Sequence, residues 1–239
     1  MSKVSKCRLI PCYSKMKNFL FFSLKNPLLL LLLLTVLFAY PTFSQTYNFN
    51  SVDNIIENAI RERAFPSAVL VVGNSKDVIY QNAYGRLTYD DDAPITTIRT
   101  IYDLASVTKV IATTSAIMRL YEDGLISLDA PVTAYIPEFG VNDKGDITVM
   151  NLLLHNSGLT AWTPFYQDTN MTSPDKVKNA IYTCTKEYPT GTRTLYSDYN
   201  AFLLGEIVER VSRYKLNTFC RENIFSKLGM TDTEFLIPL

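Results

Sequence analysis

Histidine and cysteine, the commonest ligands of structural metals, are scarce in this sequence. The 239 residues include one histidine, His155, and four cysteines, of which only Cys184 and Cys220 lie outside the N-terminal region. A zinc site needs three or four His, Cys or carboxylate ligands, and one histidine with two distant cysteines does not supply them. The composition therefore excludes most zinc chemistry, and we expect neither a metal nor a cofactor.

An excess of basic charge is also absent. The chain has 23 basic and 23 acidic residues. Six of the basic residues and none of the acidic ones precede residue 45, so the remainder carries 17 basic against 23 acidic residues. A mildly acidic chain has no basic stripe with which to contact phosphates, and we expect no nucleic-acid partner.

A long apolar run is absent except near the N-terminus. A basic stretch there precedes the leucine run 28–34, which is extended by apolar residues to Ala39. This apolar core is shorter than the roughly 20 residues that span a bilayer, and the pattern is typical of a secretory signal peptide. We predict a leader over residues 1–44 and an exported domain over residues 45–239, periplasmic or secreted. An uncleaved membrane anchor is the alternative.

The exported part is long enough for one domain with a substantial core. It opens with a helical period over Val52–Arg63, which Ser51 can cap. Two apolar stretches, 68–72 and 78–85, flank the turn sequence 74–77 and predict an antiparallel hairpin, with the first strand nearly buried on both faces. A helix followed by a hairpin is typical of an α+β fold. Because two strands make a poor sheet alone, we expect more strands to join.

The sequence Ser106-Val107-Thr108-Lys109 precedes an uninterrupted apolar segment, residues 110–121, that we predict to be helical with Val110, Ile111, Ile117, Met118, Leu120 and Tyr121 on one side. Residues three apart share a helix face, so Ser106 and Lys109 would present a hydroxyl and an amine together. Unpaired N–H groups at a helix start can hold a developing oxyanion, which is the arrangement of an activated nucleophile. A serine that merely caps the helix is the alternative.

A short helix is predicted over residues 149–155, started by Thr148 and stopped by Gly158. Leu152, Leu153 and Leu154 are its expected core residues, and His155 is its last residue. A Ser-His-Asp hydrolase would have to use this histidine as its base. We favour a structural role, in which His155 closes the turn through hydrogen bonds.

Aromatic residues are concentrated between residues 160 and 190, and this segment could either wall a substrate cleft or cover the core. Tyr196 follows, just before Ser197 or Asp198 caps the next helix. That helix is predicted from an apolar stripe with helical spacing, Phe202, Leu203, Ile207, Val208 and Val211. A phenol near an ammonium can have its pKa lowered and act as a base. The alternative is that Tyr196 only packs. Whether Cys184 and Cys220 form a disulfide stays open.

Taken together, the segments 102–109, 125–132, 147–159 and 189–200 resemble the serine β-lactamase and penicillin-binding DD-peptidase superfamily, in the branch with class C β-lactamases, D-alanyl-D-alanine carboxypeptidases and esterases. The resemblance covers about residues 50 to 237. It implies a β-lactamase/transpeptidase-like fold, an antiparallel sheet plus a helical subdomain.

The resemblance assigns roles to single residues. Ser106 corresponds to the acylated nucleophile, with its N–H as half of the oxyanion hole. Lys109 corresponds to the amine that lowers the pKa values of its neighbours, and Tyr196 to the general base. Asp198 stands at the substrate-binding position where class C enzymes have asparagine. An aspartate at this position is more similar to the carboxypeptidase and esterase members.

A second departure concerns the third motif of the family. Neither Lys-Thr-Gly nor His-x-Gly occurs in the chain, and the later strands of the sheet are missing from the sequence given. The resemblance therefore implies a C-terminally truncated chain that is weakly active or inactive alone, because one missing oxyanion donor costs about 100- to 1000-fold.

These features predict an exported serine hydrolase that forms an acyl-enzyme on Ser106 and acts on D-Ala-D-Ala peptides of the peptidoglycan type or on small esters. It would contact a membrane only if the leader were uncleaved. A class C-type β-lactamase is one alternative. A truncated, non-catalytic remnant or binding protein is another.

Overall fold

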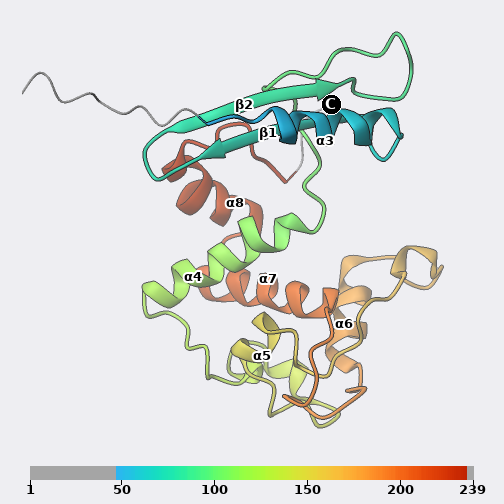
Figure 1. The fold of residues 1–239 in the computed structure, drawn as a ribbon. Coiled ribbons are helices and arrows are strands. Elements are labelled where there is room, and N and C mark those ends of the chain that lie inside the picture. The colour runs from blue at the N-terminus through green and yellow to red at the C-terminus, as the bar shows by residue number, and fades with distance from the viewer. Residues whose placement is uncertain (1–46, 236–239) are drawn as a thin grey trace, which may run out of the picture. The chain divides into compact units, whose positions relative to one another are not determined.

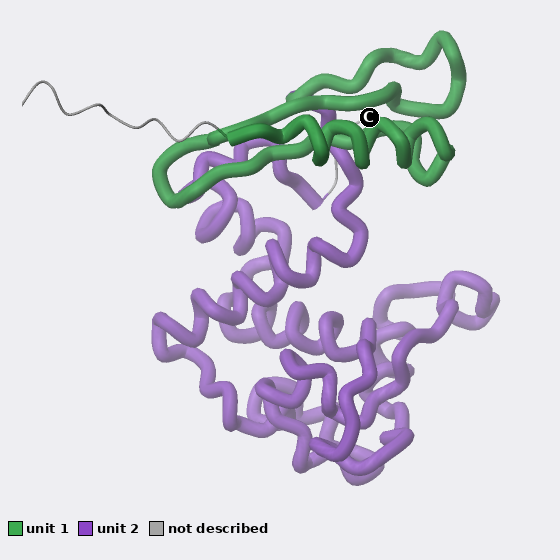
Figure 2. Tube along the Cα trace, in the orientation of Figure 1, with its two compact units in different colours: residues 1–98 green, residues 99–239 purple. Residues whose placement is uncertain are grey.

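The computed structural model describes residues 47–235, so the predicted leader over residues 1–44 lies outside the described residues. The chain divides into two compact units, residues 1–98 (unit 1) and residues 99–239 (unit 2) (Figure 2). Unit 1 contains a helix and a hairpin, and unit 2 contains the other helices (Figure 1). All four residues assigned to the site belong to unit 2.

Unit 1 is built on the predicted hairpin. Helix α3, Asn50–Arg61, precedes strands β1, Ser67–Gly73, and β2, Val78–Gly85, which pair antiparallel with Val69 opposite Ala83. The side chain of Asn74 shapes the turn, because its Oδ1 accepts the N–H groups of Lys76 and Asp77. The hairpin prediction is therefore confirmed.

Burial in unit 1 differs from the sequence expectation. Val71 in β1 is 58% exposed, so β1 is not buried on both faces. The helix start is also different, since α3 begins at Asn50 with Phe49 rather than Ser51 at the N-cap position. Within the described residues the sheet has two strands, and the joining of further strands stays a prediction.

The helical segment after Ser106 contains a wide turn that the sequence did not predict. Residues Lys109–Thr114 form a π-helix, η1, and α4 continues over Ser115–Glu122. The predicted apolar face is wrong in part, because Val110 and Met118 are exposed while Ala112 and Ala116 are buried. A π turn places its bonds five residues apart, which rotates the face that the following residues present to the core.

Helix α7, Asp198–Ser212, is the centre of unit 2 and is contacted by η1, α4, α5 and α8 (Figure 1). Its inner face carries Leu203, Ile207 and Val208, all fully buried, which confirms the predicted helical stripe. The remaining elements of unit 2 are α5 Val149–Leu153, α6 Pro174–Thr183, α8 Leu216–Cys220, the π-helix η5 Arg221–Phe225 and the 3-10 turns η2 Val132–Ala134, η3 Pro137–Gly140, η4 Phe165–Gln167 and η6 Ser226–Leu228.

Helix α5 begins as predicted and ends earlier. Thr148 and Asn151 form a reciprocal capping box at its start. The helix is over by Leu153, and Leu154 is 54% exposed, so the expectation of three core leucines is wrong for that residue. His155 then adopts a left-handed backbone with φ +54°. The chain therefore turns at His155, three residues before Gly158.

Cys184 and Cys220 do not form a disulfide in the structure. Cys184 is half-buried and Cys220 is fully buried. The Cys220 thiol lies 3.7 Å from the carbonyl oxygen of Ala112, within the π-helix η1. The two cysteines are therefore separate free thiols in unit 2.

Candidate active site

Ser106 is exposed and lies where a strained backbone turn becomes helical. The carboxylate of Asp103 accepts the N–H of Ala105, and Ala105 has φ +43°, which is uncommon for a residue with a Cβ. Helical turns begin directly afterwards, as the N–H of Lys109 donates to the carbonyl of Ser106 at 3.1 Å. Within the described residues, no backbone carbonyl accepts the N–H of Ser106. That N–H is therefore free to contact an oxyanion, as strained backbone at functional sites often permits.

Lys109 joins the serine to a carboxylate. Its ammonium Nζ donates to Ser106 Oγ at 3.1 Å and lies 3.0 Å from Oδ1 of Asp198. Burial lowers the pKa of Lys109, but hydrogen bonds with Tyr196 and Asp198 and the charge of Asp198 outweigh it, so this pKa is raised. Lys109 is therefore an ammonium ion at neutral pH.

Tyr196 completes the group from a loop that precedes α7. Its half-exposed ring has the Lys109 ammonium 5.3 Å from the ring centroid. Hydrogen bonds with Ser106 and then with Lys109 hold the pKa of Tyr196 below the ordinary tyrosine value, while the Asp198 carboxylate opposes this shift. A phenol with a lowered pKa beside a serine hydroxyl can accept its proton.

Asp198 is the first residue of α7, where the helix dipole favours a negative charge. Ser197 occupies the N-cap position of α7, as predicted, but its side chain does not cap the helix. Its hydroxyl instead donates to the carbonyl of Thr160 at 2.6 Å. The Asp198 N–H donates to the carbonyl of Ala161 at 2.8 Å. The loop 160–161 thus fixes the start of α7. The structure brings together all four residues that the sequence singled out.

His155 takes part in a different set of hydrogen bonds from that of Ser106. The hydrogen-bond partners of the serine hydroxyl are Lys109 and Tyr196. The His155 ring instead accepts the Ser197 N–H on Nδ1 at 3.1 Å, which confirms the predicted hydrogen-bonding role. No sequence pattern indicated that its partner would be the segment carrying Tyr196, about 40 residues later.

The aromatic segment after residue 160 covers the core in part, and its role as the wall of a substrate cleft stays a prediction. Phe165 stacks on Tyr199 of α7 with centroids 6.0 Å apart, and Tyr182 is buried. Trp162 and Tyr166 are exposed, by 55% and 80%. Part of the segment therefore covers the core, and part offers aromatic surface next to the residues that hold Asp198.

Other kinds of site are not found in the described part of the chain. Residues 47–235 contain no group of three or more His, Cys, Asp or Glu side chains arranged to hold a metal ion. In the same range, no helix combines the length and the apolar character needed to cross a membrane.

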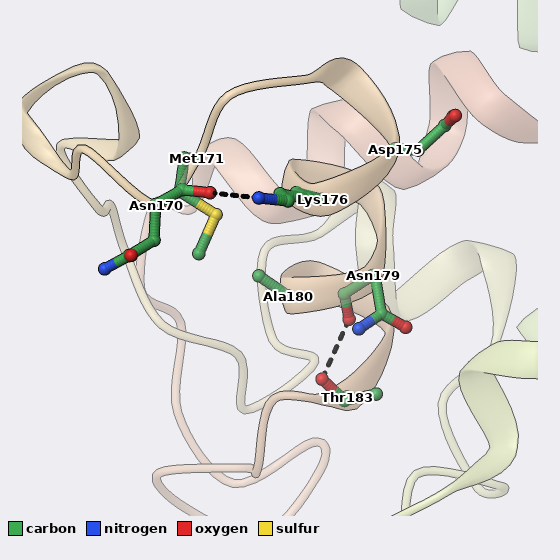
Figure 3. A pocket seen from close by; sticks show the side chains of 7 residues that line it. All are labelled: Asn170, Met171, Asp175, Lys176, Asn179, Ala180 and Thr183. Carbon is green, nitrogen blue, oxygen red and sulfur yellow. Dashed lines mark hydrogen bonds between the residues drawn. The ribbon is translucent and has the colours of Figure 1, made fainter.

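A surface pocket of about 540 Å³ lies against α6, apart from the candidate site (Figure 3). Lys176 bridges one side of the pocket by donating to the carbonyl of Asn170 at 3.0 Å. None of the four site residues lines it; the lining residues are Asn170, Met171, Asp175, Lys176, Asn179, Ala180 and Thr183.

The chain is similar to several known proteins. The family model described as Beta-lactamase matches residues 52–238. An Escherichia coli K12 protein named "Putative D-alanyl-D-alanine carboxypeptidase" is 31% identical over 78% of this chain and 46% of its own length. An N-acetylmuramyl-L-alanine amidase of Bacillus subtilis is 31% identical over 79% of this chain and 46% of its own length.

Among solved structures, a class C beta-lactamase shares the fold with a TM-score of 0.68 at 21% identity. That alignment covers 80% of this chain and 51% of the beta-lactamase. The chain therefore spans about half the length of the relatives it matches.

Proposed function

The chain belongs to the beta-lactamase family, and from this membership we propose that it is a serine hydrolase that forms an acyl-enzyme on Ser106. The observation that carries the proposal is the contact of one ammonium, Lys109 Nζ, with both Ser106 Oγ and the Asp198 carboxylate, beside the phenol of Tyr196. A nucleophile, a base and a charge that stabilises the base are the parts that covalent acyl transfer requires.

In the proposed reaction, Tyr196 as phenolate takes the proton of Ser106, and the serine oxygen attacks the substrate carbonyl carbon. The Ser106 N–H donates to the oxyanion that forms on the carbonyl oxygen. Collapse of this intermediate breaks the bond to the leaving group, which receives the proton from Tyr196. Water, deprotonated by Tyr196, then attacks the acyl carbon, and the serine leaves with the proton. The Lys109 ammonium stabilises the phenolate throughout.

The substrate class that we favour is a D-Ala-D-Ala peptide of the peptidoglycan type or a small ester. The names of the two bacterial relatives support acyl chemistry on cell-wall peptides. Asp198 supports the carboxypeptidase and esterase branch, since class C enzymes are expected to have asparagine there. A β-lactamase is the second candidate, favoured by the fold shared with the class C structure.

We also propose that the protein is exported. The basic stretch and leucine run within residues 1–44 support a signal peptide, which would deliver residues 45–239 to the periplasm or medium. That location would bring the site to peptidoglycan.

Intact mass spectrometry of the protein with and without benzylpenicillin tests the acyl-enzyme. We expect a mass increase of one penicillin that is lost in Ser106→Ala and kept in Ser127→Ala, a change of another exposed serine. Slow release as hydrolysed penicillin favours the peptidase reading, and rapid release favours a β-lactamase. The absence of both an adduct and hydrolysed penicillin after prolonged incubation, or an adduct that persists in Ser106→Ala, would overturn the acyl-enzyme and leave a non-catalytic binding protein or remnant.

A further inference from the structure

His155 holds the backbone on both sides of Tyr196. Its carbonyl oxygen accepts the N–H of Leu195 at 2.8 Å, and its ring Nδ1 accepts the N–H of Ser197 at 3.1 Å. The imidazole and phenol rings also contact each other, with centroids 4.8 Å apart and planes 39° apart. One residue therefore bonds to the peptide groups before and after the proposed base and packs against its ring.

The surrounding hydrogen bonds fix which nitrogen of His155 carries the proton. A backbone N–H can only donate, so Nδ1 must accept from Ser197. The side-chain nitrogen of Asn200 also lies 3.1 Å from Nδ1, and its oxygen accepts the hydroxyl of Ser157 at 2.6 Å, which turns the amide NH₂ toward the imidazole. Ser157 and Asn200 are both buried. This arrangement requires a neutral ring with its proton on Nε2.

We propose that neutral His155 is a positioning residue for Tyr196, and that protonation of its ring releases the loop 195–197 and withdraws the phenol from Ser106. This role rests on the proposed function, in which Tyr196 is the base. It extends that function by giving the site an acid limit set by a residue that touches neither the substrate nor the reacting atoms.

Protonation would place an N–H on Nδ1, facing two donors, the Ser197 N–H and the Asn200 amide. Both hydrogen bonds would become repulsive contacts. The charged and titratable groups that face the ring are the Lys109 ammonium, the Asp198 carboxylate and the Tyr196 phenol. Burial and then Lys109 lower the pKa of His155, against Asp198, so the ring is neutral at neutral pH and the release belongs to acidic solution.

The structure offers a matched pair of variants at this position. His155→Asn keeps a short acceptor near Ser197 and suits a left-handed backbone, whereas His155→Phe keeps a ring against Tyr196 but has no acceptor. We expect His155→Phe to slow acylation of Ser106 by penicillin roughly 10- to 100-fold, the cost of a misplaced catalytic group, and His155→Asn to recover most of the rate. Equal rates in the two variants would contradict the role of Nδ1.

The pH profile separates positioning from simple packing. In the wild type, the acylation rate should fall in acid with the titration of both Tyr196 and His155, and in His155→Asn with that of Tyr196 alone. The wild-type profile should therefore be the steeper of the two. Identical slopes would contradict the proposed release.

A third measurement does not depend on activity. Because His155 is the single histidine of the chain, selective ¹⁵N-histidine labelling gives ring signals from one residue only. We expect an unprotonated Nδ1 and a protonated Nε2 at neutral pH, and a Tyr196 ring resonance, assigned with Tyr196→Phe, that shifts as His155 titrates. A protonated Nδ1 at neutral pH, or a Tyr196 signal indifferent to His155, would overturn the inference. Absence of a penicillin adduct would instead count against the proposed function alone.

Discussion

The ammonium of Lys109 lies 3.0 Å from the carboxylate of Asp198, on the first residue of the central helix α7. The two groups are partly exposed, with side-chain exposures of 25% and 43%. An ion pair of this exposure contributes little to stability, because water screens it. Its consequence is instead electrostatic, since Asp198 helps to keep Lys109 protonated. Asp198 also opposes the lowering of the pKa of the neighbouring Tyr196 phenol.

Asp198→Asn tests this balance through the pH dependence of acylation. Without the carboxylate, the pKa of Tyr196 should fall further, because the group that opposed its lowering is gone. The pKa of Lys109 should also fall, since Asp198 raises it. If Tyr196 must be deprotonated to act, the acidic limb of the rate of penicillin adduct formation should move to lower pH.

Asp175→Asn is the matched control for that measurement. Asp175 also lies in the first turn of a helix, α6, but has no contact with the site. Its removal should leave the acidic limb in place. An acidic limb that stays fixed or moves to higher pH in Asp198→Asn would show that this carboxylate does not oppose the ionisation of Tyr196.

A buried lysine elsewhere in unit 2 gives a prediction about stability. Lys144 is fully buried, and its ammonium donates to the carbonyl oxygens of Val141 and Cys184, each at 2.6 Å, and lies 4.9 Å from the centroid of the Phe139 ring. Burial lowers the pKa of Lys144, and no carboxylate opposes this shift. The lysine therefore links the loop at residue 141 to the end of α6 through hydrogen bonds.

Replacing Lys144 with methionine should destabilise the protein by about 1–3 kcal/mol, because two carbonyl groups lose their donor. Lys176→Met is the control, since the Lys176 ammonium makes one exposed hydrogen bond to the Asn170 carbonyl beside the pocket of Figure 3. We expect that change to stay within about 0.5 kcal/mol. Urea unfolding followed by circular dichroism measures both. A similar loss in the two variants would mean that the buried contacts of Lys144 are dispensable.

Local pattern was enough to predict the parts of the fold that regular periodicity specifies. The hairpin of β1 and β2 followed from two apolar stretches around a turn sequence, and the buried face of α7 followed from a 3.6-residue period. The proximity of Ser106, Lys109, Tyr196 and Asp198 followed from motifs in a known order. These features depend on residues near one another in sequence, or on a family pattern that already contains the fold.

Features that depend on irregular backbone were missed. The π turn of η1 changes which side of the helix is buried. A count at a fixed helical period placed Val110 and Met118 on the apolar face, whereas both are exposed in the structure. The left-handed conformation of His155 and its bonds around Tyr196 join segments 40 residues apart, and nothing in the local sequence encodes that pairing. Lys144 was not singled out from the sequence, since its partner Cys184 is equally remote.

The glycine of the turn after His155 gives the last prediction, because it governs the same pairing of segments. Gly158 has φ +88°, and an added Cβ would lie 2.3 Å from the carbonyl oxygen of Tyr188. Its own carbonyl accepts the N–H of Glu187 at 2.8 Å. Gly191 also has a positive φ, +81°, but an added Cβ there would meet no atom within 4 Å.

The two glycines therefore separate conformational strain from steric contact. Gly191→Ala should cost only the left-handed backbone, about 1–2 kcal/mol, whereas Gly158→Ala adds a clash with a main-chain atom and should cost several kcal/mol. Since the segment that pairs with Gly158 through Glu187 leads to Tyr196, we expect Gly158→Ala alone to slow acylation of Ser106 as well. Denaturant unfolding and penicillin adduct formation test both effects. Equal destabilisation by the two alanines would mean that the Tyr188 carbonyl yields easily, and the pairing of residues 155–161 with residues 187–198 would then be too compliant to hold a catalytic phenol in place.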